Sequence, residues 1–194
     1  MRLTRPTLLF LGAWLCLSLP ASALVGGTVH DFSSNGWSGG KICVVCHIPH
    51  HADASVSDLP LWNHEISSAT YTPYSSPTMS AVPGQPRGPS KLCLSCHDGM
   101  VAIDSFGGMS GSDFVTGSAA IGTDLSDDHP VSILWTHQTE MPSCSNCHSA
   151  FVLPFFEGYL ECSTCHDVHN GSGFPSLLNM PKAGSVLCFF CHGK

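Results

Sequence analysis

The sequence predicts a mostly irregular fold with a few short α-helices. Of the 194 residues, 19 are glycine and 14 are proline, and both residue types interrupt helices and strands. No segment keeps a sustained helical or strand periodicity of apolar residues. Charged residues make up only 11% of the chain, which excludes a solvated, disordered chain. A chain with this composition needs something besides side-chain packing to form its core.

The first 23 residues have the pattern of a secretory signal peptide. Two arginines precede an apolar stretch over residues 8–19, and the small residues 21–23 form a cleavage site. The apolar stretch is shorter than the roughly 20 residues that a membrane-spanning helix needs. We therefore expect residues 1–23 to be a cleaved signal and residues 24–194 to form one exported domain with no transmembrane span.

The chain is acidic, with 14 acidic residues against 7 basic ones. Arg2 and Arg5 lie in the proposed signal, so the mature chain is more acidic still. Because it lacks a basic patch that could neutralise phosphates, we expect no nucleic-acid partner.

The cysteines follow one pattern throughout the mature chain. Apart from Cys16, in the proposed signal, they form five C-x-x-C pairs, each followed at once by histidine. The pairs are Cys43 and Cys46, Cys93 and Cys96, Cys144 and Cys147, Cys162 and Cys165, and Cys188 and Cys191; the histidines are His47, His97, His148, His166 and His192. In the C-x-x-C-H motif of c-type haem attachment, the two thiols bond the macrocycle and the imidazole is the proximal iron ligand. The sequence therefore predicts five covalently attached c-type haems, stacked to form most of the core.

Two other kinds of site also use many cysteines. An exported, cysteine-rich chain can be a disulfide scaffold, and C-x-x-C pairs can bind zinc. Neither requires a histidine after every pair, and the uneven spacing of the motifs also argues against zinc. Haem attachment accounts for both features.

Seven histidines remain as candidates for the distal position, on the opposite face of each iron. We select His30, His50, His64, His129 and His169, and keep His51 and His137 as substitutes. His50 and His169 each follow a motif histidine by three residues, so neither can easily wrap around the same haem. We expect each of them to reach the iron of a neighbouring haem and to hold two haems close together.

Local sequence adds three expectations. His129 follows Asp124, Asp127 and Asp128, whose carboxylates could orient its imidazole through the second ring nitrogen. Residues 69–90 are rich in proline, serine, threonine and glycine, which favours an extended loop. Each motif is expected to begin a helical turn or two.

Several segments resemble the multihaem c-type cytochromes with doubled C-x-x-C-H motifs. They are HDFS at 30–33, CVVCHIPH at 43–50, PLWNH at 60–64, KLCLSCHDGMVAID at 91–104, TDLSDDHPVS at 123–132 and CSTCHDVHN at 162–170. The chain is most similar to the filament-forming, outer-surface cytochromes of metal-reducing bacteria, the OmcE type. That resemblance implies few secondary-structure elements, bis-histidine haems in alternating parallel and T-shaped pairs, and extracellular electron transfer. It also implies that a histidine near the N-terminus, here His30, ligates a haem of the neighbouring subunit. The OmcE type carries four haems, whereas this chain has motifs for five.

These observations favour an electron-transfer protein rather than an enzyme. Its expected partners are other redox proteins or extracellular acceptors, and we expect self-association into a filament outside the cell or at its surface. A soluble periplasmic carrier is the alternative. A multihaem reductase needs an iron with an open site, and the chain has no C-x-x-C-K motif of the kind that often marks a catalytic haem.

Overall fold

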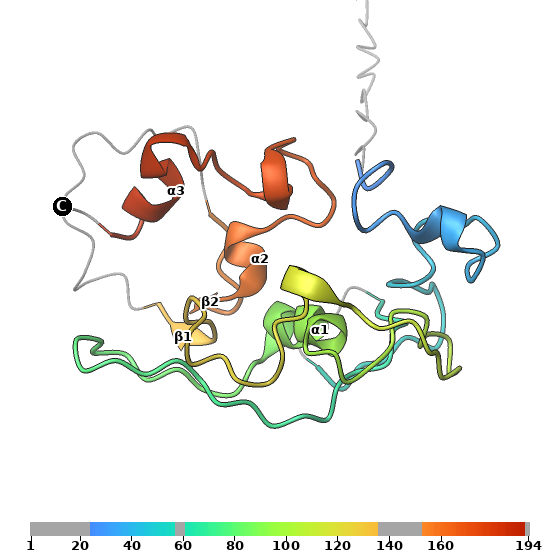
Figure 1. Ribbon diagram of the computed structural model, residues 1–194, viewed down its shortest axis with the longest axis horizontal. Coiled ribbons are helices and arrows are strands. Elements are labelled where there is room, and N and C mark those ends of the chain that lie inside the picture. The colour runs from blue at the N-terminus through green and yellow to red at the C-terminus, as the bar shows by residue number, and fades with distance from the viewer. Residues whose placement is uncertain (1–23, 57–60, 136–152, 193–194) are drawn as a thin grey trace, which may run out of the picture.

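The computed structural model describes residues 24–56, 61–135 and 153–192, and most of their length is irregular (Figure 1). The longest helix is α1 (Gly88–His97), and two single-turn helices follow it, α2 (Cys162–Cys165) and α3 (Val186–Phe189). The described residues also form four short 3₁₀-helices: Phe32–Asn35, Gly117–Ala119, Pro175–Leu177 and Ala183–Ser185. The predicted fold class, mostly coil with a few short helices, is confirmed.

A minimal sheet joins two parts of the chain. Strands β1 (Ile133–Leu134) and β2 (Tyr159–Leu160) pair antiparallel, with Ile133 opposite Leu160. Next to this sheet, the Ser132 N–H donates to the carbonyl of Leu160 at 2.7 Å. The sheet thereby ties the segment before the undescribed residues 136–152 to the start of α2.

Helix α1 begins and ends at residues suited to those positions. Proline occupies the first turn, where a missing N–H costs no hydrogen bond. Gly99, with φ of +74°, follows the last turn and donates its N–H to the carbonyl of Cys96 at 3.1 Å. The second motif therefore lies at the C-terminal end of α1. The sequence predicts instead that each motif begins a helix. The fourth motif does open its helix, α2.

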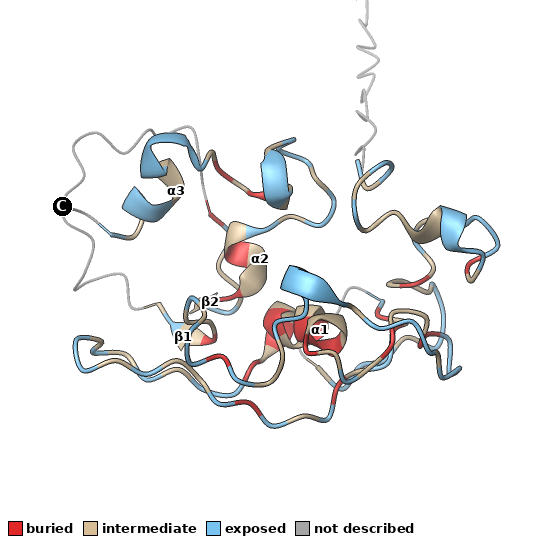
Figure 2. Cartoon of the chain, in the orientation of Figure 1, coloured by how far each residue is buried: buried red, intermediate tan, exposed pale blue. Residues whose placement is uncertain are grey.

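The protein core is small and lies around α1. Tyr71, Leu94 and Leu125 form its central cluster, and Figure 2 shows the buried residues concentrated near α1 and α2. Tyr71 belongs to the segment predicted to be an extended loop, so that loop is anchored by a buried aromatic ring. Among the described residues twelve apolar side chains are buried, too few to stabilise this part of the chain by packing alone.

A buried carboxylate extends this core. Asp98 is 5% exposed and accepts hydrogen bonds from the hydroxyls of Ser67 at 2.5 Å and Tyr71 at 2.7 Å. Burial raises the pKa of Tyr71 to about 12, so its hydroxyl keeps the proton that it donates. These bonds hold the loop segment against the end of α1, beside His97.

Candidate haem-binding sites

The four described motifs each form about one turn of helix. In the first, fourth and fifth motifs the histidine N–H donates to the carbonyl of the first cysteine, at 2.8 Å, 2.9 Å and 2.8 Å. The second motif lies within α1. Positions i, i+3 and i+4 share one face of a helical turn, which is the spacing that brings two thiols and an imidazole to one side. This arrangement allows one macrocycle to form two thioether bonds with the cysteines and to receive the histidine as an iron ligand.

The described motif cysteines are available for attachment. All eight are free thiols, so the structure contains no disulfide among them. Among the described residues, no group of three or more histidine, cysteine or acidic side chains could hold a bare metal ion. Six of the described histidines meet in pairs.

Three such pairs have nearly the same separation. The ring centroids are 6.1 Å apart for His47 and His169, 6.1 Å for His30 and His97, and 6.3 Å for His129 and His192. The interplanar angles differ, at 19°, 58° and 76°. Each pair joins a motif histidine to a predicted distal histidine from a distant part of the sequence.

This separation fits an iron with two axial imidazoles. A metal–imidazole bond of about 2 Å on each side, plus roughly 1 Å from nitrogen to ring centre, places the centroids about 6 Å apart. The ring planes may rotate about that axis, which accommodates the different interplanar angles. The described residues therefore fit bis-histidine haems at the first, second and fifth motifs.

Hydrogen bonds at Nδ1 orient several of these rings. The Nδ1–H of His97 donates to the Ala119 carbonyl at 2.7 Å, that of His166 to the Ser176 carbonyl at 3.0 Å, and that of His129 to the Pro130 carbonyl at 3.1 Å. Since a carbonyl can only accept, Nδ1 carries the proton and Nε2 keeps its lone pair for a metal. A backbone carbonyl therefore orients His129, whereas the sequence predicts that a neighbouring aspartate does so.

The surroundings of His30 favour a neutral imidazole. Burial lowers the pKa of His30, and the nearby His97 and His166 lower it further, so its imidazole is neutral at pH 7, as a metal ligand must be. Its Nδ1 is buried and has no hydrogen-bond partner among the described residues. The resemblance to filament cytochromes implied that His30 ligates a haem of another subunit, but the structure places it beside His97 of its own chain.

Two other distal candidates lie elsewhere. His64 is 2% exposed, and its nitrogens contact the carbonyls of Glu65 at 2.7 Å and Ala102 at 2.9 Å. Its Nε2 lies 3.3 Å from the Cys96 sulfur, so the ring sits beside a thiol of the second motif instead of opposite a motif histidine. His50 and its substitute His51 are exposed. The third motif, Cys144 to His148, and the other substitute, His137, lie outside the described residues.

Sequence reasoning missed the acidic residues beside the motifs. Asp98 and Asp167 each follow a motif histidine directly, and this repeated aspartate was a signal that could have identified them. Asp167 accepts the N–H groups of His169 at 2.9 Å and Gly171 at 2.7 Å, and its Oδ1 lies 3.6 Å from the His169 Nδ1. It therefore fixes the turn that carries a distal candidate.

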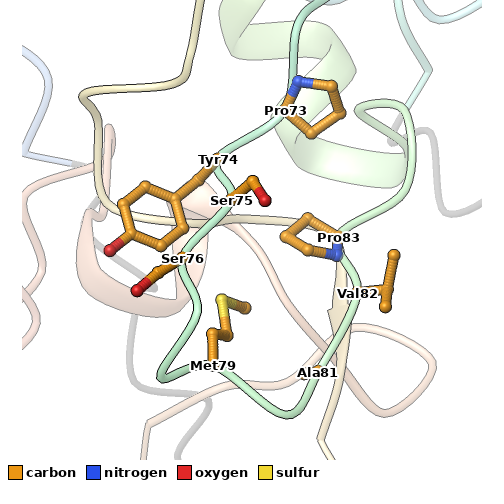
Figure 3. Close-up of a pocket in the computed structure, with 8 residues that line it drawn as sticks. All are labelled: Pro73, Tyr74, Ser75, Ser76, Met79, Ala81, Val82 and Pro83. Atoms are coloured by element: carbon orange, nitrogen blue, oxygen red, sulfur yellow. The ribbon is translucent and has the colours of Figure 1, made fainter.

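A shallow pocket lies apart from this chemistry. Its lining comes from one loop, with Tyr74 and Met79 among the side chains (Figure 3). The lining contains no histidine or cysteine, so the pocket does not belong to the motif sites. Among the described residues, no helix has the length and apolar character needed to cross a membrane.

Comparison with known proteins agrees with the motif chemistry. The model of a protein family described as "Doubled CXXCH motif" matches residues 154–194, which hold the fourth and fifth motifs. No curated protein matches the chain. The family match supports a multihaem c-type cytochrome-like protein, and its CXXCH motifs indicate covalently bound c-type haem. Electron transfer is the function that such motifs suggest.

Proposed function

We propose that this chain is an exported electron-transfer protein that carries five c-type haems, most of them bis-histidine. We propose further that it acts in extracellular electron transfer and associates with copies of itself into a filament. The observation that carries the electron-transfer proposal is the set of three imidazole pairs at 6.1–6.3 Å. When bound, haem supplies one-electron redox chemistry.

The protein side chains would determine what the iron can do. With an imidazole on each side, no position is left for a substrate, and two nitrogen ligands give a lower potential than histidine with methionine. The carbonyls of Ala119 and Pro130 hold two of these rings in place, so little would have to move when an electron arrives. Such sites are suited to electron transfer and unsuited to substrate reduction.

The position of His30 affects how copies could join. Because His30 pairs with His97 inside one chain, a joint between subunits would need a different histidine. His50 and His51 are exposed on a turn in which His51 has φ of +60°. They are the described residues best placed to reach a neighbouring copy.

Two measurements test the proposed function. Mass spectrometry of the mature protein should give the mass of the chain from residue 24 plus five haems, and the reduced protein should bind no carbon monoxide at the three paired sites. Stoichiometric carbon monoxide binding without ligand exchange would instead indicate an open iron and the reductase alternative. Electron microscopy of secreted material tests the filament: regular fibres support it, and monodisperse particles favour a soluble periplasmic carrier.

A further inference from the structure

We propose that the fourth motif, Cys162 to His166, is the junction of the haem network, in contact with the first, second and fifth haems. The order of haems in space would then differ from the order of motifs in sequence. This proposal rests on the proposed electron-transfer function and deepens it, because it identifies the site through which electrons must pass.

The contact with the first haem runs through a short turn. His166 is the proximal ligand of the fourth motif, and His169, three residues later, lies 6.1 Å from the ring of His47. Three residues span at most about 10 Å even when extended. A single turn, fixed by Asp167, would therefore connect the irons of the first and fourth haems.

The contact with the second haem is made between two helices. Helices α1 and α2 pack together, and each carries a thiol of its motif, Cys93 on α1 and Cys162 on α2. The Ser90 hydroxyl of α1 accepts the Cys162 N–H at 2.9 Å and donates to Glu161 at 2.5 Å. Because each thiol is an attachment point, the thioether edges of the second and fourth haems would adjoin.

The contact with the fifth haem follows from the chain after α2. A β-bridge pairs His166 with Leu178, and the Asn179 N–H donates to the Cys165 carbonyl at 2.8 Å. This returns the chain past α2 before it enters α3, and Figure 1 shows α2 between α1 and α3.

Exposure separates the outer motifs from the inner ones. Cys43 of the first motif and Cys188 of the fifth are exposed, whereas Cys93 and Cys162 are not. The first and fifth haems would therefore present an edge to partners. An electron that enters at one and leaves at the other would cross the fourth.

The test uses haem-loaded protein in which one distal ligand at a time is changed. His169→Met, His30→Met and His129→Met should each raise the potential of one haem, the first, second and fifth respectively. That haem is then reduced at a higher potential than the other haems. The electron that it gains lowers the potential of its nearest neighbours. Site-resolved redox titration by NMR of the haem methyl groups reads these shifts. Val82→Met, at an exposed position in the loop apart from the motif sites, is the control.

If the fourth motif is the junction, the potential of the fourth haem, bound by His166, shifts in all three variants. The proposal is wrong if the potential of the third haem, bound by His148, shifts in all three variants. It is also wrong if, in each variant, only the haems of the neighbouring motifs in the sequence shift. If either of these results is found in protein that keeps five haems and is reduced reversibly, the electron-transfer function stands and only the junction is wrong. Loss of haem or of reversible reduction from the unmodified protein would contradict the function itself.

Discussion

The imidazole rings of His47 and His169 lie nearly parallel, at 19°, with their centroids 6.1 Å apart. One belongs to the first motif and the other follows the fourth, so the contact closes a large loop of the chain. The separation matches two imidazoles on one iron. Ligation of one haem iron by both rings would account for this geometry.

The first prediction concerns this pair. In haem-loaded protein, His169→Ala should remove one axial ligand from the iron held by His47, so one haem becomes high-spin. The reduced variant should bind about one carbon monoxide per chain. Optical and EPR spectra of the oxidised protein provide the measurement, with the exposed Val82→Ala as the control. A variant in which every haem stays low-spin would exclude His169 as a ligand.

The second prediction uses the ring angles. The mutual orientation of two axial imidazole planes sets the splitting of the iron d orbitals, and therefore the EPR signal of a low-spin haem. The near-parallel pair of His47 and His169 should give a rhombic signal, and the pair of His129 and His192, at 76°, a strongly anisotropic one. His129→Ala should remove the anisotropic signal and leave the rhombic one. Loss of the rhombic signal in that variant would contradict the pairing.

The third prediction concerns Glu161, which is 1% exposed. Its carboxylate accepts from the hydroxyls of Ser90 at 2.5 Å and Ser132 at 3.0 Å, while Oε1 has no partner among the described residues. Burial raises the pKa of Glu161 above its usual value of 4.5. The folded protein therefore binds this proton more tightly than the unfolded chain.

The sign of the pH dependence follows from that shift. The contribution of Glu161 to stability is present below pH 4.5 and is lost as the pH rises through the raised pKa. In Glu161→Gln the free energy of unfolding should fall less over this interval than in the wild type. Urea unfolding of haem-loaded protein at several pH values measures it, with exposed Glu65→Gln as the control. Equal slopes in Glu161→Gln and the wild type would show that Glu161 does not titrate there.

The fourth prediction tests the small protein core. Tyr71→Phe removes the hydroxyl that donates to the buried Asp98 at 2.7 Å and should lower the free energy of unfolding by about 1–2 kcal/mol. Tyr74→Phe is the matched control, because Tyr74 lies in the partly exposed loop that lines the pocket. The urea midpoint should move clearly for the first variant alone. Equal midpoints would mean that the Asp98 bond adds nothing to stability.

Composition and motifs predicted the irregular fold because glycine, proline and the C-x-x-C-H spacing act locally. They also selected His30, His129 and His169, which the structure places opposite motif histidines. Which histidine meets which motif depends on long-range folding, and no local pattern encodes it. For the same reason the burial of His64 beside Cys96 and the link between Glu161 and α1 could not be predicted from their neighbours in sequence.

The most direct test of bis-histidine ligation is an experimental structure of the haem-loaded, secreted protein. The account predicts that His47 and His169 bind one iron through Nε2, that His30 and His97 bind a second, and that His129 and His192 bind a third. An iron at the first, second or fifth motif that is ligated on its distal face by water, by another residue or by nothing would contradict it.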